Sequence, residues 1–313
     1  MSDASQIPHF VYFFDDDFAP CTLVSLRSVL SRLAGDARVS LHPTFESDNL
    51  RQDVASLAHA FPESDIALRE VDLTPWRHLP RGRLPLAARA RLLLPDIHSG
   101  RVLYLDGDAL ARRDLTPLWR VDLGDKCIGA ALAPGVQAIL ERYANSRSQP
   151  ARKAGEKTLE RGRRLDGIDM QRYFNSGVMV LDLDAIHAKG LAERMMDIEA
   201  TAAYTSRDQD WLNMVFRNET QVLDPTWNSG WGNPRTAKRY VSPDLRARFR
   251  ESREDPAIIH YTGFEKPWSA PRPPFRLHLL TKPLERRLRA RYWAEFQTER
   301  AATEALLGHP LWP

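Results

Sequence analysis

The feature that most restricts the fold of this sequence is a regular alternation of strand-like and helix-like segments near its N-terminus. Short apolar runs predict strands over residues 10–14, 39–45 and 67–73. Between them, apolar residues at helical spacing predict helices over residues 20–33 and 50–61. Strands separated by single helices pair in parallel through right-handed crossovers. This part of the chain therefore predicts an α/β fold built on a parallel sheet.

The next predicted strand, Val102–Leu105, ends in two acidic residues, Asp106 and Asp108. Side chains alternate along an extended chain, so these two carboxylates point to one side, where they repel each other unless a cation or donors stabilise them. Gly107 between them leaves room for a closely approaching ligand. Oxygen ligands at the carboxyl end of a strand suit Mg²⁺ or Mn²⁺ and a diphosphate. The alternative is an ordinary turn or helix cap.

The rest of the chain predicts more strands, over residues 127–132, 173–183, 221–223 and 257–261. Helices are predicted over 84–94 and 184–200, and a third begins at Asp208-Gln-Asp210. Acidic residues at a helix start are often simple dipole partners. His260, on the last strand, is by itself interpreted as a core residue.

Residues 133–171 are rich in Arg and Lys and poor in large apolar residues. A solvated, mobile excursion is the simpler interpretation, and a lid over an anionic substrate is the alternative.

Composition restricts the class of protein. With 44 basic and 41 acidic residues in 313, the net charge of +3 argues against a dedicated nucleic-acid binder. Two cysteines, Cys21 and Cys127, exclude a disulfide framework and favour a reducing compartment. Without a visible signal peptide or a membrane-spanning run, we expect a cytoplasmic protein, soluble or peripheral on the inner face of the membrane.

The last segment, 271–313, combines basic residues with aromatic and aliphatic ones at helical spacing. The basic residues are Arg276, Lys282, Arg286, Arg287, Arg289 and Arg291, and the apolar ones are Phe275, Leu279, Leu280, Leu284, Leu288, Tyr292 and Trp293. This pattern is typical of a segment that binds an anionic membrane surface, or of a charged helix that packs on its parent domain. We therefore expect a main domain over 1–270 and a small, basic, helical C-terminal extension over 271–313.

Several separated segments together resemble glycosyltransferase family 8, which includes bacterial lipopolysaccharide α-galactosyl- and α-glucosyltransferases and the glycogenins. The segments are Ser25-Leu-Arg-Ser-Val29, Leu103-Tyr-Leu-Asp-Gly-Asp108, Tyr173-Phe-Asn-Ser-Gly177, Asp208-Gln-Asp210 and His260-Tyr-Thr-Gly-Phe-Glu-Lys-Pro-Trp268. The resemblance runs from about residue 10 to residue 268.

The resemblance implies a single catalytic domain of the GT-A fold, a Rossmann-like nucleotide-sugar-binding architecture. It also implies retaining transfer from a UDP-sugar and dependence on Mn²⁺, with Mg²⁺ as the alternative ion. The implied metal ligands are Asp106, Asp108 and His260.

Further residues match the family's donor site. The uracil and ribose would contact Phe13, Asp15, Asp17 and Phe18, where the family usually has Asn and Tyr in place of Asp17 and Phe18. The donor sugar and phosphates would contact Arg91, Asp106, Gly107, Asn175, Ser176, Gly177, Asp208, Gln209, His260, Gly263 and Lys266. Lys266 would neutralise the leaving diphosphate.

Asp208 and Gln209 are the implied catalytic residues. Gln209 is a poor nucleophile, so we expect same-face attack by the acceptor hydroxyl, assisted by the departing phosphate oxygen. The acceptor is expected to be a saccharide or lipid-linked molecule of lipopolysaccharide or capsule assembly, contacted by residues 133–171 and 227–240. Galactose and glucose both stay open as the transferred hexose.

Two other functions stay open at this point. A nucleotidyltransferase that makes sugar nucleotides usually carries a Gly-rich basic loop after its first strand, where this chain has Asp15, Asp16 and Asp17. A catalytically silent binder of nucleotide sugars, or a membrane-associated scaffold, would be favoured if the acidic pair, His260 or Asp208 were missing.

Overall fold

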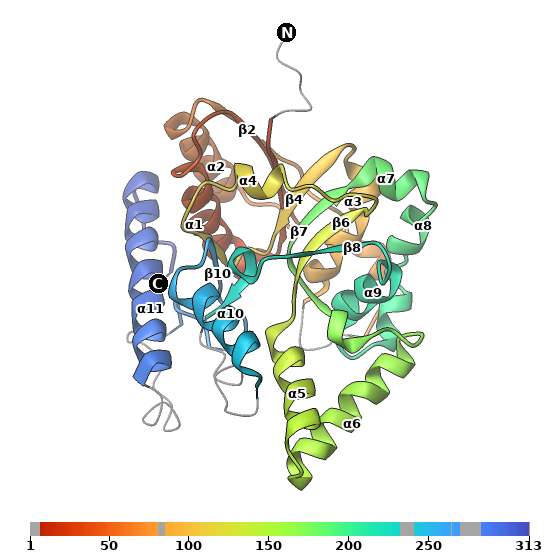
Figure 1. The fold of residues 1–313 in the computed structure, drawn as a ribbon. Helices are drawn as coiled ribbons and strands as arrows, with labels where there is room; N and C mark the ends of the chain where they lie inside the picture. The colour runs from red at the N-terminus through yellow and green to blue at the C-terminus, as the bar shows by residue number, and fades with distance from the viewer. Residues whose placement is uncertain (1–6, 81–84, 232–240, 264, 270–282, 313) are drawn as a thin grey trace.

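A seven-stranded sheet forms the centre of the protein (Figure 1). The structure is a computed structural model that describes residues 7–80, 85–231, 241–263, 265–269 and 283–312. The strand order is β3-β2-β1-β4-β7-β6-β8. The bounds are β1 His9–Phe14, β2 Ala37–Pro43, β3 Ser64–Leu68, β4 Arg101–Leu105, β6 Ile128–Leu132, β7 Phe174–Asp182 and β8 Thr220–Leu223.

The predicted parallel sheet is confirmed for β3, β2, β1 and β4, which pair in parallel. The other half differs, because β7 runs antiparallel to both β4 and β6. Its start therefore lies beside the end of β4, with Leu105 opposite Val178. The backbone N–H of Asp106 donates to the carbonyl of Gly177 at 2.8 Å. This antiparallel pairing brings the segment Asn175–Gly177 to the acidic pair.

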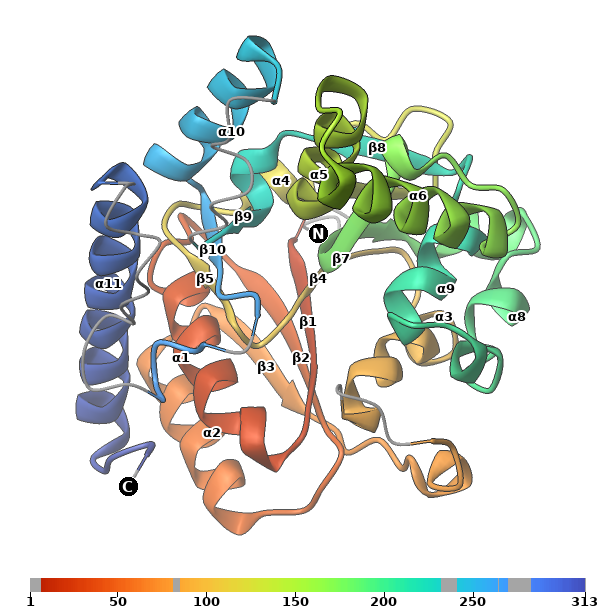
Figure 2. The ribbon, with the colours of Figure 1, turned by 90° about the horizontal axis from the view of Figure 1, so that it is seen from below.

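Helices cover both faces of the sheet (Figures 1 and 2). Along β1, side chains alternate between two apolar cores: Phe10, Tyr12 and Phe14 enter one, and Val11 and Phe13 enter the other. The first core packs on α1 (Ala19–Leu30) and α2 (Asp48–Ala60). The second packs on α7 (Leu183–Ala188), α8 (Ala192–Met195) and α9 (Arg207–Val215).

A small second sheet places His260 next to the acidic pair. It has the order β5-β10-β9, formed by Ala109–Ala111, Ile258–His260 and Ser229–Gly230. His260 pairs with Ala109, and the N–H of Tyr261 donates to the carbonyl of Asp108 at 2.9 Å. The predicted last strand is confirmed, whereas β5 and β9 were not predicted.

Several predicted boundaries are wrong for local reasons. The third strand ends at Leu68, since its partner β2 ends at Pro43, which has no N–H to extend the ladder. The helix over 84–94 is a 3-10 helix, Leu86–Leu93, followed by α3 (Leu94–Ile97). The helix over 184–200 is broken by Gly190, which has a φ of +67°.

Residues 133–171 form a helical hairpin, α5 (Pro134–Asn145) and α6 (Gln149–Arg164), that extends away from the sheet (Figure 1). Most residues of α6 are exposed, which agrees with the expected solvated excursion. The helices meet through small residues: a Cβ at Gly155 would lie 2.2 Å from the Tyr143 ring. The shortage of large apolar residues therefore reflects close helix packing. The lid interpretation stays a prediction.

The C-terminal helix α11 (Pro283–Leu307) packs against α1 and α2 (Figure 2). Leu288, Tyr292 and Phe296 are buried there, and Glu299 pairs with Arg27 of α1 and with Arg32, which follows that helix. Its apolar side chains thus follow the second alternative, a charged helix on its parent domain. Phe275, Arg276, Leu279, Leu280 and Lys282 lie outside the described residues. Two further helices, α4 (Thr116–Trp119) and α10 (Pro243–Glu254), were not predicted. Among the described helices, none is long and apolar enough to cross a bilayer.

Three histidines gather between β1, β2 and the segment after α3. The Nε2 atoms of His42 and His98 lie 2.8 Å apart, and the His9 and His98 rings meet edge to face at 4.9 Å. Burial lowers the pKa of His9 and of His42 to about 4, and that of His98 to about 3. Since one Nε2 must accept the other's proton, the pair cannot carry a proton on both atoms.

These histidines predict a loss of stability in mild acid. Below a pH of about 6.5, these histidines bind protons in the unfolded chain but stay neutral in the folded protein. The free energy of unfolding therefore falls as the pH is lowered from about 6.5 to 4, by up to about 1.4 kcal/mol per pH unit for each histidine. Above about pH 6.5 this contribution does not change. Urea unfolding at several pH values measures the slope. His98→Gln should reduce the slope, and an unchanged slope would contradict the prediction.

Candidate active site

The carboxylate of Asp106 has one oxygen held by protein donors and one left facing the centre of the site. Oδ1 accepts from the Tyr104 hydroxyl at 2.6 Å and lies 3.0 Å from the Arg91 guanidinium. Oδ2 lies 3.6 Å from Nε2 of His260. The protein therefore aims a defined oxygen atom at the imidazole.

Asp108 has the same division of its oxygens. Oδ1 lies 3.1 Å from Nε2 of His260, whereas Oδ2 pairs with the ammonium group of Lys266. Burial by itself raises the pKa of Asp108, but the neighbouring His260 and Lys266 outweigh burial and hold this pKa well below its usual range. The side chain is thus a buried carboxylate at neutral pH.

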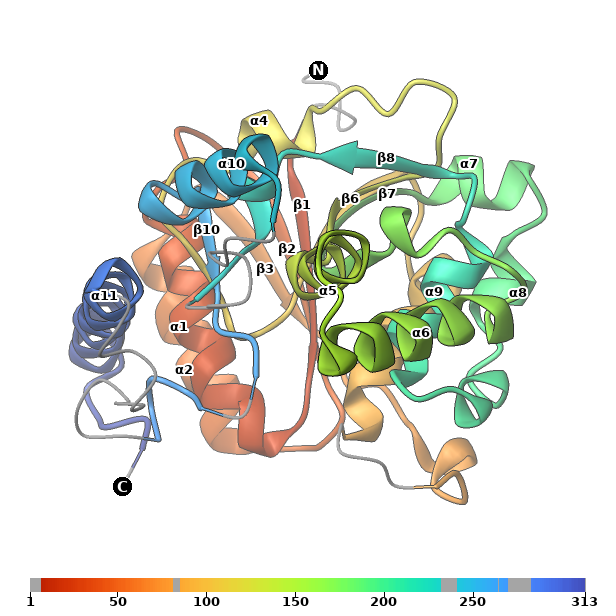
Figure 3. The same cartoon turned by 60° about the horizontal axis from the view of Figure 1, so that its bottom comes forward.

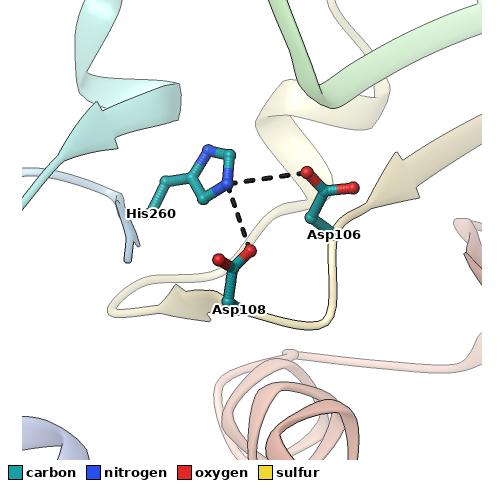
Figure 4. Close-up of side chains that lie close together, drawn as sticks. All are labelled: Asp106, Asp108 and His260. Carbon is teal, nitrogen blue, oxygen red and sulfur yellow. Dashed lines mark ion pairs between the residues drawn. The ribbon is translucent and has the colours of Figure 1, made fainter. Parts of the chain in front are cut away.

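Together these side chains form a group suited to a divalent cation (Figure 4). One ligand atom each from Asp106, Asp108 and His260 lies within 4.8 Å of the others. Adjacent ligands of an octahedral Mg²⁺ stand roughly 3 Å apart, close to the observed 3.1 and 3.6 Å. Two carboxylates and an imidazole suit Mn²⁺ as well as Mg²⁺. The residues present therefore fit the implied metal.

Two glycines are required by close approach at this point. A Cβ on Gly177 would lie 2.2 Å from Cε1 of His260 and 2.5 Å from Oδ2 of Asp106, so only glycine allows the cluster to form. A Cβ on Gly107 would lie 2.1 Å from Oγ1 of Thr22. Gly107 thus makes room for α1, which is a different reason from the ligand access expected of it.

Arg91 connects Asp208 with the metal group, which is the cluster of Asp106, Asp108 and His260. Its Nε lies 3.2 Å from Oδ2 of Asp208, and its guanidinium stacks over the Tyr104 ring at 4.6 Å. It also donates to the carbonyl of Ser176 at 2.9 Å. A buried cation between two carboxylates compensates charges that would be costly to bury separately.

Asp208 is buried and incompletely paired. Its exposed fraction is 2%, and its Oδ1 has no hydrogen-bond partner within the described part of the chain. Burial raises its pKa to about 6, although Arg91 opposes the shift. Arg207, directly before it, has a φ of +46°, which is unusual outside glycine. An unpaired buried carboxylate oxygen indicates a site that binds a ligand.

Gln209 and the segment Asn175–Gly177 form one hydrogen-bonded unit. Oε1 of Gln209 accepts from Nδ2 of Asn175 at 3.1 Å and from the N–H of Ser176 at 3.3 Å. The start of β7 and the first turn of α9 are therefore held together, as their shared place in the implied donor site requires.

Other predicted donor-site residues lie on the opposite side of Asp108. The Lys266 ammonium lies over the rings of Phe18, at 5.6 Å, and Trp268, at 5.5 Å. Asp15 accepts from the N–H of Phe18 at 3.1 Å, and Asp17 is exposed. Gly263, with a φ of +97°, lies three residues before Lys266 in the sequence.

Phe13 lies apart from this group, since its ring is buried and stacks on His42 at 4.7 Å. Its contact with a donor stays a prediction.

The site also contains residues to which the sequence assigned no role. Tyr104 and Tyr173 stand inside recognised segments but read as ordinary core residues. Asn228 binds Nδ1 of His260 at 2.8 Å, and Arg161 of α6 pairs with Asp210. Asn228 could have been noticed in the sequence as a polar residue in a Trp- and Gly-rich loop. No sequence feature distinguishes Arg161 from its basic neighbours.

Comparison with protein families agrees with this geometry. The model of the family described as glycosyl transferase family 8 matches residues 9–271. The chain belongs to glycosyl transferase family 8. It is therefore related to the lipopolysaccharide glycosyltransferases, and this membership decides against the nucleotidyltransferase alternative.

Individual relatives are distant. The chain is 27% identical to general stress protein A of Bacillus subtilis (strain 168), covering 85% of this chain and 88% of that protein. It is 24% identical to the lipopolysaccharide 1,3-galactosyltransferase of Salmonella typhimurium, over 85% of this chain and 74% of that protein. It is 28% identical to a lipopolysaccharide 1,2-glucosyltransferase of Escherichia coli, but spans only 56% of its length.

Solved structures show the same fold. The galactosyltransferase LgtC, in complex with donor and acceptor sugar analogues, has a TM-score of 0.67 at 23% identity and covers 94% of this chain and 95% of its own. The bifunctional glycosyltransferase WbbM has a TM-score of 0.69 at 21% identity, with 96% of this chain matching 52% of that one. The predicted GT-A fold is confirmed.

Gly177 provides a test of the metal group. Gly177→Ala should weaken Mn²⁺ binding by at least about 10-fold, because the added methyl group displaces His260 and Asp106. Calorimetric titration of the protein with Mn²⁺ measures the affinity. Gly35→Ala is the matched control, since a Cβ there meets nothing within 4 Å. Undiminished binding in Gly177→Ala would place the ion elsewhere.

Proposed function

We propose that the protein is a retaining, Mn²⁺-dependent glycosyltransferase that moves glucose or galactose from a UDP-sugar to a saccharide or lipid-linked acceptor. The observation that carries this proposal is the convergence of Asp106, Asp108 and His260 at the carboxyl end of β4, in a chain of glycosyl transferase family 8. The named glucosyl- and galactosyltransferase relatives support a hexose donor. The solved LgtC complex supports a pair of donor and acceptor sugars.

Asp106, Asp108 and His260 would hold the cation. When bound, the ion supplies neutralisation of the negative charge that develops on the leaving diphosphate. Lys266 lies beside Asp108 and supplies a further positive charge to the same diphosphate. The ammonium of Lys266 lies over the rings of Phe18 and Trp268, and cation–π attraction to these rings would keep it near the leaving group.

Asp208 and Gln209 would face the sugar. The unpaired Oδ1 of Asp208 is suited to stabilise positive charge that develops at the anomeric carbon. Gln209 is an amide, whose two polar atoms already bond Asn175, Ser176 and Tyr173, so it orients the sugar rather than attacking it. A solved LgtC variant, described as an active-site mutant, exchanges a glutamine for glutamate, which supports a glutamine as an active-site residue in this fold.

The proposed reaction is a same-face displacement. The acceptor hydroxyl oxygen bonds to the anomeric carbon as the bond from that carbon to the phosphate oxygen breaks. The hydroxyl proton passes to the departing phosphate oxygen, and UDP leaves with the bonding electron pair. The configuration at the anomeric carbon is retained, and no side chain forms a covalent adduct.

The setting of the reaction is also a proposal. We infer a role in lipopolysaccharide or capsule assembly at the cytoplasmic face of a membrane. The division into a catalytic domain over 1–270 and an extension over 271–313 stays a prediction, as do contacts of the acceptor with residues 133–171. Part of the other predicted acceptor loop, residues 232–240, lies outside the described residues.

The function is tested by release of UDP from UDP-glucose or UDP-galactose in the presence of Mn²⁺ and a saccharide. Asp108→Asn and His260→Ala should each lower the rate by about 100-fold or more, because the leaving-group charge is no longer neutralised. Asp65→Asn, at an exposed position on β3, is the matched control and should leave the rate unchanged.

Each outcome of this assay decides something. An α-linked product, identified by NMR, would agree with retention, and a β-linked product would contradict it. Full activity in Asp108→Asn or His260→Ala would place the metal site elsewhere. A wild-type protein that binds UDP-sugars but releases no UDP with any acceptor would favour the silent binder.

A further inference from the structure

A continuous chain of side-chain hydrogen bonds connects the metal group to the hairpin helix α6. It begins at Nδ1 of His260, on the side of the imidazole away from the two carboxylates, and ends at the ion pair between Asp210 of α9 and Arg161 of α6. Its members, in order, are His260, Asn228, Asn175, Gln209, Tyr173, Asp210 and Arg161.

The orientation of Asn228 in this chain follows from a backbone group. The N–H of Gly177 donates to Asn175 at 3.1 Å, so the atom of Asn175 on that side is its oxygen. The group of Asn228 that bonds the same oxygen, at 2.8 Å, is therefore its NH₂. The oxygen of Asn228 is left facing His260.

This orientation determines the tautomer of His260. Oδ1 of Asn228 lies 2.8 Å from Nδ1 of the imidazole and can only accept, so Nδ1 carries the proton. In the neutral ring, the lone pair of Nε2 then faces Asp106 and Asp108. This is the tautomer that a metal-ligating Nε2 requires.

The far end of the chain is anchored in the same way. The N–H of Ser176 identifies the oxygen of Gln209, so the NH₂ of Gln209 donates to the Tyr173 hydroxyl at 3.1 Å. Tyr173 donates in turn to Asp210 at 2.7 Å. Every hydrogen bond thus runs in one direction, from the imidazole to a buried carboxylate, and aligned bonds polarise one another.

Arg161 closes the chain from the hairpin. Its Nε donates to Asp210 at 2.9 Å, and its guanidinium also donates to the Tyr173 hydroxyl at 2.6 Å. Figure 3 shows α6 beside α9, where this contact forms. The orientation of the internal amides is therefore stabilised by a residue outside the sheet.

We propose that Asn228 is a positioning residue that holds His260 in its metal-binding tautomer, and that Gln209, Tyr173 and Asp210 hold Asn228 in that orientation through Asn175. The proposal rests on the metal-dependent function proposed above. It assigns to Gln209 a second task, because the amide expected to orient the sugar also relays the orientation of the metal ligand.

The test measures the affinity for Mn²⁺ in the absence of any sugar nucleotide, with EPR used to monitor the concentration of the free ion. The melting temperature of each variant is the second readout. Asn228→Ala should weaken Mn²⁺ binding by about 10- to 100-fold. Asn228→Asp keeps an acceptor for the Nδ1 proton and should bind within about 3-fold of the wild type, even though a buried carboxylate lowers its melting temperature. A merely structural asparagine predicts the reverse ranking of the two variants.

Tyr173→Phe tests the rest of the chain. It should weaken binding by about 3- to 10-fold, whereas Tyr12→Phe, which removes another buried hydroxyl that bonds Ser25 and not these residues, should not. Wild-type affinity in Asn228→Ala would overturn the proposal, and wild-type affinity in Tyr173→Phe would overturn its extension beyond Asn228. A wild-type protein that binds no Mn²⁺ and transfers no sugar would instead refute the proposed function.

Discussion

The two carboxylates at the end of β4 repel each other, and the surrounding structure must compensate this repulsion. Asp106 and Asp108 stand on one short loop, and the small second sheet brings His260 against both. The antiparallel strand β7 adds Gly177, whose missing side chain leaves space for this convergence. Of the elements beside the loop, β10 therefore supplies the imidazole of His260, and β7 leaves space for it through Gly177. The main sheet acts as a rigid base for this arrangement.

Buried charges in this region are compensated in pairs. Arg91 lies between Asp106 and Asp208, and Lys266 pairs with Asp108. Such pairs rarely add net stability, because desolvation offsets their attraction, but removing one partner leaves a costly buried charge. Their value here is geometric, since they direct specific oxygens toward the site. Oδ1 of Asp208 has no hydrogen-bond partner among the described residues, and it lies where a sugar is expected.

The peripheral helices support the site from two sides. On one side, α6 reaches the interior through Arg161 and anchors the buried amides. On the other, aromatic residues of the C-terminal region support the Lys266 loop: Trp268 stacks on Trp312 at 6.0 Å and packs on Phe296 of α11 at 5.4 Å. Leu288 and Tyr292, two residues of the predicted membrane-binding pattern, are buried in the same apolar cluster as Phe296.

The sequence by itself determined the features that arise within a few residues. It identified the first strands and helices from their periodicity, the acidic pair from side-chain alternation, and the family from short segments in a fixed order. The tertiary structure decided the features that depend on distant pairing: the direction of β7, the contact of His260 with Asp108, the hairpin packed through Gly155, and the role of Asn228. The local geometry of a helix or strand depends on residues that are close in sequence, so it can be predicted from the order of the residues. A hydrogen bond between Asn228 and His260 depends on strand register across 32 residues, and nothing in either neighbourhood encodes it.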